Sequence, residues 1–352
     1  MKMRTFGRSA LGAFLAAAGL LAAGCGGGAK APGILHVYTW SDYVKPELIA
    51  RFEAENNCKV VIDTFDSNEA MYAKLKAGAT GYDVITPTSY MVSLMQSQGM
   101  LLPLDHSRLP NLSRVDPDYL AIAIDKTMAY SVPYMLTNTG IAYLKSKVKD
   151  FEPTWAMFNR SDLRGRMVML NDMRETIGAA LKFLGYSLNS TNPEELSAAK
   201  NVVLAWKENL AKFENEQYKT GIASGEFLLV HGYSGDVLQV QAENEDIAFA
   251  MPREGGAISC DDLVIAKTAK EPDLAHAYIN FFHDPAVAAE NTEFIQYLCP
   301  NKDSYLLLKA EITGNPGIFL APEIKAHCEI LADLGEKNAL YVKIWDEIKA
   351  GK

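Results

Sequence analysis

The stretch Tyr38-Thr39-Trp40-Ser41-Asp42-Tyr43 decides how this chain is interpreted. It follows the apolar residues 34–37, which read as a first strand, and it precedes residues 46–52, which have a helical pattern. Strand-to-helix turns are where open α/β sheets present ligand-binding groups. This turn combines aromatic rings, a carboxylate and a hydroxyl, a set that suits an organic ammonium ion. A single tryptophan after a strand can equally anchor a core, so the interpretation depends on matching groups elsewhere.

The composition favours some partners over others. The 352 residues exceed one ordinary domain, and the 49% apolar content supports a sizeable core. The formal net charge is −9, and it becomes −12 without residues 1–24, which hold three basic residues and no acidic ones. An acidic body repels nucleic acid and anionic membranes and attracts cationic ligands. We therefore expect no nucleic-acid partner.

The N-terminus has the order of a bacterial lipoprotein signal. Basic residues precede an apolar run at 10–23, and small residues follow it up to Cys25. We predict a signal peptide over 1–24, lipidation of Cys25, with palmitate among the acyl chains, and a flexible tether over 25–33. An ordinary cleaved signal with an incidental cysteine is the alternative. The mature protein is expected in the periplasm or on the outer face of the cytoplasmic membrane, anchored by its lipid.

Signals of catalysis or metal binding are weak. The sequence has no glycine-rich phosphate loop and no nucleophile elbow. His276 and His283 lie seven residues apart without a third ligand, so we expect ordinary residues of a helix surface. We predict no catalytic residue, no cofactor and no metal. The cysteines of the mature body are widely spaced, and we expect either free thiols or one disulfide among Cys58, Cys260, Cys299 and Cys328.

Strand and helix patterns alternate along most of the chain. Apolar runs at 59–63 and 82–86, with a helical pattern at 67–77 between them, continue the first strand into a βαβαβ series. Such a series implies a parallel sheet with right-handed crossovers. Further strands are expected at 131–134, 167–170, 227–231, 247–250 and 263–266. Further helices are expected at 171–184, 192–213, 272–283, 285–295, 322–332 and 339–350.

Acidic and aromatic residues recur where these elements meet. Asp172 and Glu175 lie three residues apart at a helix start and share a face, although helix capping would also explain them. Tyr233 and Asp236 follow a strand, and Asp261 precedes one. A diamine carries a charge at each end of an alkyl chain, so each nitrogen needs a carboxylate and the methylenes need flat apolar walls. The recurring pattern predicts a site for a small organic cation.

Several motifs, in the same order along the chain, resemble the spermidine/putrescine-binding proteins of bacterial ABC importers. The resemblance runs from about residue 34 to the C-terminus and is carried by residues 38–43, 67–69, 82–85, 131–134, 232–236 and 252–256. It implies a two-lobed α/β fold, the type II periplasmic-binding-protein fold, with a mixed, mainly parallel sheet flanked by helices in each lobe and a ligand cleft between the lobes. Lobe 1 would comprise 34–135 and 262–307, and lobe 2 would comprise 136–261 and 308–352.

The resemblance also implies which residues contact the ligand. They are Trp40, Ser41, Asp42, Tyr43, Thr88, Tyr90, Asp172, Glu175, Tyr233, Asp236, Asp261, Tyr297 and Asp333. Ser259 departs from the family, which has an aromatic residue there, and Tyr233 stands where a tryptophan is usual. Because Ser41-Asp42 matches the putrescine-type pattern, putrescine is the favoured ligand and spermidine the other candidate.

These observations predict a monomeric extracytoplasmic receptor, not an enzyme, that captures a polyamine and delivers it to an ABC permease in the inner membrane. Two alternatives stay open. One is a receptor of the same fold for another small cationic or amino compound, which the departure at Ser259 suggests. The other is a polyamine sensor that docks a signalling partner.

Overall fold

In the computed structural model, residues 32–121 and 123–351 are described, and a compact unit begins at Gly33. The predicted signal peptide and Cys25 lie outside the described residues. Over the described ranges, no helix combines the length and the apolar character that crossing a bilayer requires.

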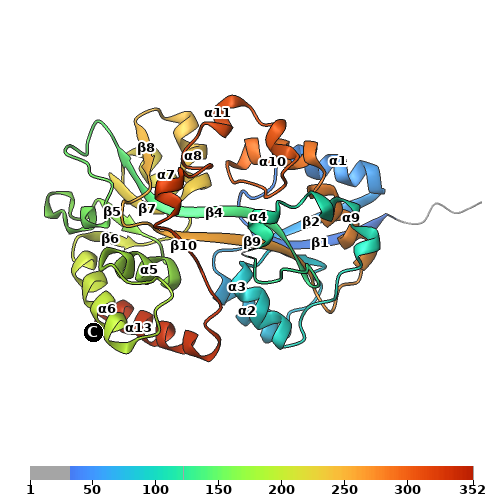
Figure 1. The fold of residues 1–352 in the computed structure, drawn as a ribbon, viewed down its shortest axis with the longest axis horizontal. Helices are drawn as coiled ribbons and strands as arrows, with labels where there is room; N and C mark the ends of the chain where they lie inside the picture. Colours follow the sequence, from blue (N-terminus) through green and yellow to red (C-terminus); the bar gives the residue numbers. More distant parts are fainter. Residues whose placement is uncertain (1–31, 122, 352) are drawn as a thin grey trace, which may run out of the picture. The chain divides into compact units, whose positions relative to one another are not determined.

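The described strands form one sheet in the order β2-β1-β3-β9-β4-β7-β5-β6, with β10 beside β9 and β8 beside β4 (Figure 1). Pairs towards both ends of this order are parallel, whereas β9 and β4 in the middle pair antiparallel with each other and with β3, β7 and β8. The strands are β1 Gly33–Trp40, β2 Cys58–Phe65, β3 Val84–Ile85, β4 Ser131–Leu144, β5 Met167–Met169, β6 Leu210–Phe213, β7 Leu229–Tyr233, β8 Ile247–Ala250, β9 Ala257–Ile265 and β10 Glu329–Ile330.

Helices connect these strands and cover the sheet (Figure 1). They are α1 Pro46–Asn56, α2 Asn68–Lys76, α3 Ser89–Ser97, α4 Pro117–Leu120, α5 Met173–Phe183, α6 Pro193–Lys207, α7 Tyr218–Ser224, α8 Ser234–Glu243, α9 Pro272–Phe282, α10 Pro285–Ile295, α11 Ala310–Thr313, α12 Pro322–Lys325 and α13 Asn338–Ala350. Many begin with proline at the first turn or with a capping side chain, which satisfies or removes backbone N–H groups that lack a partner.

Two strands join the halves of the sheet. The first part of β4, Ser131–Asn138, pairs with β9, and its last part, Thr139–Leu144, pairs with β7 and β8. Separate hydrophobic clusters lie on the two sides of this junction, one around β1 and β3 and another around β5 and β7. Strand β4 contributes to both of these clusters, through Val132, Tyr134 and Met135 in the first and Ile141 in the second.

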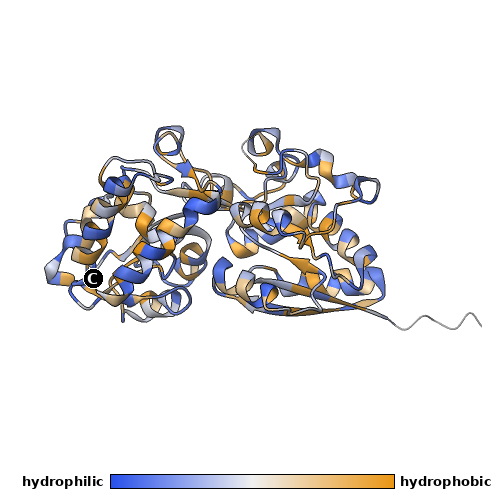
Figure 2. Cartoon of the chain, turned by 90° about the horizontal axis from the view of Figure 1, so that it is seen from below, coloured by the Kyte–Doolittle hydropathy of each residue, from blue (hydrophilic) through white to orange (hydrophobic). Residues whose placement is uncertain are grey.

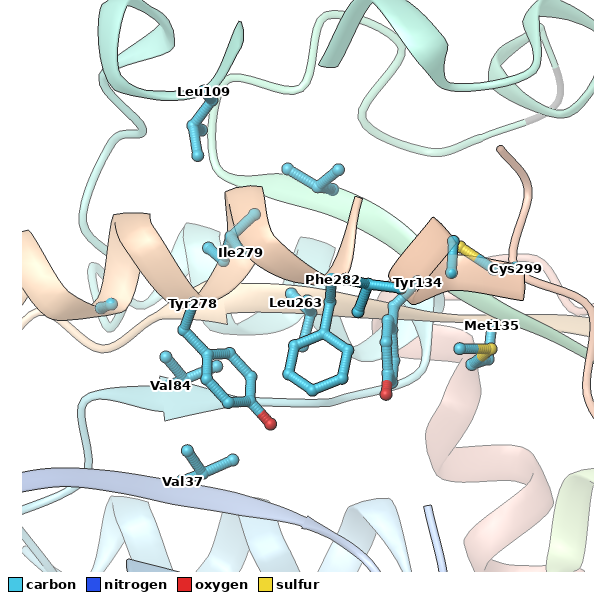
Figure 3. Close-up of a cluster of buried hydrophobic side chains, with 14 of the residues drawn as sticks. Val37, Val84, Leu109, Tyr134, Met135, Leu263, Tyr278, Ile279, Phe282 and Cys299 are labelled. Carbon is cyan, nitrogen blue, oxygen red and sulfur yellow. The ribbon is translucent and has the colours of Figure 1, made fainter. Parts of the chain in front are cut away.

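Aromatic rings fill the core beside β1, β3 and β9 (Figure 3). Phe282 lies 4.6 Å from Tyr278 and 5.8 Å from Tyr134, measured between ring centroids. Edge-to-face and tilted ring pairs of this kind add stabilisation beyond the area that they bury. Figure 2 shows hydrophobic colouring in the strands and along parts of the helices, whereas hydrophilic residues occupy much of the remaining helix surface.

The structure corrects several predicted elements. The first strand continues through Trp40, so residues 38–40 are strand and not turn. Leu210 and Phe213, expected on a helix face, lie in β6. The helix expected at 322–332 is wrong: α12 ends at Lys325, and Glu329 and Ile330 pair with β9 instead. Helix α7 was not predicted at all.

Candidate ligand-binding site

A cavity of about 60 Å³, measured as the space open to the centre of a water molecule, lies where strand ends and helix starts meet. That volume exceeds the roughly 10–15 Å³ that one water needs. Eleven of the thirteen predicted residues line it. The lining residues are Trp40, Ser41, Tyr43, Asp66, Asn68, Thr88, Tyr90, Thr137, Asp172, Glu175, Asn215, Glu216, Lys219, Tyr233, Asp236, Ser259, Asp261, Tyr297 and Leu331.

Asp261 presents a carboxylate from β9 to this cavity and is 5% exposed. The hydroxyl of Thr88 donates to its Oδ1 at 2.6 Å, and the hydroxyl of Tyr43 donates to its Oδ2 at 2.5 Å. Asn68 donates in turn to Thr88, which fixes that hydroxyl. Burial raises the pKa of Asp261 to about 6, because the charged form loses its water shell. Its neutral hydroxyl partners leave it without a counter-ion.

Asp172 and Glu175 enter the cavity from the start of α5. Asp172 Oδ1 accepts from the backbone N–H groups of Arg174 and Glu175 at 2.8 and 3.1 Å, so it caps the helix and also lines the cavity. The hydroxyls of Thr139 and Ser259 donate to Glu175 at 2.6 and 3.4 Å. Burial and the nearby charge of Asp172 raise the pKa of Glu175 to about 8. Without a bound cation, burial therefore favours the protonated form of this carboxyl.

We call Asp172, Glu175 and Asp261 the open acid group. Over the described ranges, no lysine, arginine or histidine lies within ion-pair distance of any of the three. Arg174 follows Asp172 on α5, but its guanidinium donates to the carbonyl of Ala332 and to the side-chain oxygen of Asn189. The open acid group can therefore take a cation that the protein does not supply.

Aromatic rings stand beside these acids. The rings of Tyr43 and Tyr297 lie 5.4 Å apart, edge to face, and the hydroxyl of Tyr233 donates to Asp172 at 3.4 Å. Trp40 lines the cavity and packs against Phe65 at 4.4 Å between centroids. Ring faces provide apolar contact for methylene groups and attract ammonium ions.

A second set of charged groups lies in and beside the same cavity. Asp236, at the start of α8, accepts from the hydroxyls of Tyr218 at 2.8 Å and Tyr297 at 2.9 Å. The ammonium of Lys219 lies 3.8 Å from Asp236 and 2.8 Å from Asp42. We call Asp42, Asp236 and Lys219 the lysine-paired group. The sequence did not indicate Lys219, because the turn after β6 and helix α7 were not recognised.

Two predicted residues do not line the cavity. Asp42 occupies a turn with a φ of +53°, and its carboxylate, 65% exposed, is directed at Lys219. Asp333 lies exposed on the surface, where its side chain accepts from the N–H of Gly335. The left-handed turn and Lys219 hold Asp42 beside the cavity, and a local turn holds Asp333 on the surface. Direct contact with the ligand stays a prediction for these two residues, as it does for the other eleven.

Other candidate groups have ordinary structural partners. His276 and His283 are buried, not on a helix surface, and each ring bonds to two backbone groups. Cys58, Cys260, Cys299 and Cys328 are free thiols. Across residues 32–121 and 123–351, no three His, Cys, Asp or Glu side chains gather as metal ligands would.

The chain is similar to known proteins over most of its length. Residues 47–320 match the family of bacterial extracellular solute-binding proteins. The putrescine/cadaverine-binding protein of Pseudomonas aeruginosa is 36% identical over 329 residues, which are 90% of this chain and 93% of that protein. The spermidine/putrescine-binding periplasmic protein of Escherichia coli is 34% identical over 341 residues, 96% of this chain and 98% of that protein. The structure of the TpPotD lipoprotein of Treponema pallidum has a TM-score of 0.80 at 36% identity, covering 90% of this chain and 99% of that chain.

The chain therefore belongs to the family of bacterial extracellular solute-binding proteins. Its fold is the two-lobed α/β fold of periplasmic binding proteins, as the sequence resemblance implied. Proteins of this family bind a solute and do not convert it, so the chain is a binding protein and not an enzyme.

Proposed function

We propose that the chain is the extracytoplasmic receptor of a polyamine ABC importer, with putrescine as its favoured ligand. The observation that carries the proposal is the open acid group. Its three carboxylates share one cavity with aromatic rings and, within the described chain, have no basic partner. Burying an ammonium without carboxylates costs several kcal/mol or more, so a site of this composition suits a ligand that brings its own positive charges.

The names of the relatives support the same class of ligand. One is a putrescine/cadaverine-binding protein and another a spermidine/putrescine-binding protein, each matching at least 90% of this chain. The three compounds are linear amines with a protonated nitrogen at each end. We infer that this chain takes a ligand of that class and passes it to an ABC permease.

We further propose that the mature protein is a monomer outside the cytoplasm, anchored by lipid at Cys25. The family description and the periplasmic relative of Escherichia coli support the location, and the lipoprotein relative of Treponema pallidum supports the lipid anchor. We also propose lobe 1 over 34–135 and 262–307, and lobe 2 over 136–261 and 308–352. The two separate hydrophobic clusters support a division of this kind.

Isothermal titration of the mature chain tests the ligand class. We expect saturable binding of one putrescine per chain, with cadaverine and spermidine as the comparison amines. Native mass spectrometry of protein purified from cells should show a small bound amine. Binding of a different small amino compound, with no response to any of the three amines, would overturn the proposal.

A further inference from the structure

Among the described residues, one basic side chain lines the cavity, that of Lys219. Six acidic side chains line it as well. Lys219 is 12% exposed, on α7, and its ammonium lies between Asp42 and Asp236. Burial alone would lower its pKa, but Asp236 and Asp42 outweigh burial and raise the pKa, so the group stays charged. The ammonium of Lys219 thus pairs with two carboxylates, as the ammonium of a ligand would.

A row of side chains connects this lysine to the open acid group. Asp236 accepts from the hydroxyl of Tyr297 at 2.9 Å, the Tyr297 ring lies 5.4 Å from the Tyr43 ring, and the hydroxyl of Tyr43 donates to Asp261 at 2.5 Å. The part of a longer ligand that extends beyond the open acid group along these rings would be directed towards Asp236. That end of the row already holds a positive charge.

We propose that Lys219 determines specificity: its ammonium fills a cation position inside the ligand site, so the site selects short diamines over triamines. A diamine is satisfied by the open acid group and the aromatic walls. A third ammonium would have to approach Lys219, and two like charges at about 4 Å repel strongly when they are partly buried. The inference rests on the proposed polyamine function and names the residue that limits the ligand.

Titration calorimetry with putrescine and spermidine tests the inference in the mature chain and three variants. Lys219→Met keeps the length of the side chain and removes its charge, and we expect the ratio of spermidine to putrescine affinity to rise by about tenfold or more. Lys219→Arg keeps the charge and should keep the ratio of the unmodified chain. Lys212→Met, on the neighbouring strand, is the matched control, because Lys212 pairs with Glu214 outside the cavity.

Each outcome is decisive. If Lys219→Met leaves the ratio unchanged, or weakens both amines by the same factor, Lys219 is a structural ion-pair partner and the inference is overturned. If the unmodified chain binds neither amine, the proposed function fails instead. Thermal unfolding shows whether Lys219→Met is folded; should it not be, Lys219→Gln, which can still donate to Asp42, replaces it under the same expectation.

Discussion

Hydroxyl groups and backbone N–H groups, and not cationic side chains, hold the acids of the open acid group in place. Asp261 accepts from Thr88 and Tyr43, and Glu175 accepts from Thr139 and Ser259. Each carboxylate oxygen has two lone pairs, so a hydroxyl can stay in place while an ammonium binds the remaining pair. The acids are thus oriented before the ligand arrives, without a salt bridge that the ligand would have to break.

Asp261→Ala should weaken putrescine binding by about 2 kcal/mol or more, because it leaves a buried ammonium without its carboxylate. Calorimetry measures the change. Asp333→Ala is the matched control: the same substitution at a predicted residue that lies outside the cavity should leave the affinity unchanged. Equal affinity of Asp261→Ala and the unmodified chain would remove Asp261 from the site.

Glu175 should make binding depend on pH. Burial and the charge of Asp172 raise its pKa to about 8, which favours the protonated carboxyl at pH 7. A bound ammonium favours the ionised form, so binding releases a proton and affinity rises with pH, by up to roughly tenfold per pH unit below the pKa. Calorimetry in buffers of different ionisation enthalpy detects the proton. Glu175→Gln should lose this release; an identical release in the variant would assign the proton to another group.

Residue patterns predicted most of the acids and rings that line the cavity, because strand-to-helix turns bring such side chains to one edge of a sheet. They do not predict Asp66, nor Asn215, Glu216 and Lys219, which follow a short strand whose apolar spacing is typical of a helix. The position of Asp42 could not be predicted either, since it depends on a left-handed turn and on a lysine 177 residues away.

Helix α5 shows how one element serves both stability and binding. Its N-cap residue, Asp172, satisfies two backbone N–H groups and still presents its second oxygen to the cavity. The helix start also directs its positive end towards the acids, which favours their charged forms. The capping and binding interpretations of Asp172 are therefore compatible.

Asp172→Asn and Asp172→Ala should separate the two roles. Asparagine keeps the cap, so we expect unfolding in urea close to that of the unmodified chain, with weaker putrescine binding. Alanine removes the cap as well and should cost about 1 kcal/mol of stability in addition. If asparagine binds putrescine as tightly as aspartate does, the charge of Asp172 has no part in binding.

Local sequence patterns predicted the long helices and strands. They failed where tertiary contacts determine whether a segment forms a helix or a strand. Leu210 and Phe213 continue the apolar spacing of α6, but the chain leaves the helix at Lys207 and β6 pairs with β5. A helix begins at Pro322 as predicted, but it ends at Lys325, and Glu329 and Ile330 pair with β9. Helix α7 contains Gly221, whose lack of a side chain lets Phe227 pack against it, so its sequence looked like a loop.

At the scale of the molecule, the strands that join the two halves of the sheet also carry binding groups. Thr137 and Thr139 lie on β4, and Ser259 and Asp261 lie on β9. A ligand that contacts them therefore acts at the junction of the two cores. The two-lobed fold was predictable from ordered motifs, whereas the lobe boundaries stay a prediction.

Buried acids should make the ligand-free protein less stable as pH rises from 6.5 to 8. Burial is the largest cause that raises the pKa of Glu69 and Asp262 to about 7 and of Glu175 to about 8. These values exceed those of the unfolded chain, so the folded state binds more protons and its free energy of unfolding falls through this window. Below pH 6.5, His231 and His283, whose pKa burial lowers, act in the opposite direction.

Thermal unfolding at pH 6.5 and 8 measures this effect. We expect a midpoint several degrees lower at pH 8 without ligand, and a smaller difference with saturating putrescine, which stabilises the ionised acids. Glu175→Gln should reduce the difference in the ligand-free protein. A midpoint that rises between the two pH values would contradict the protonated state of these acids.

Trp40 gives the protein an intrinsic optical reporter of occupancy. Of the four tryptophans, Trp155 and Trp206 are fully buried in a core and Trp345 of α13 packs against Phe213, whereas Trp40 lines the cavity. Ligand entry should therefore change the emission of one indole, and Trp40→Phe should abolish the change while Trp345→Phe keeps it. If both variants respond equally, the emission change comes from elsewhere. Binding of an amine that does not itself fluoresce can then be followed by tryptophan fluorescence, without a label.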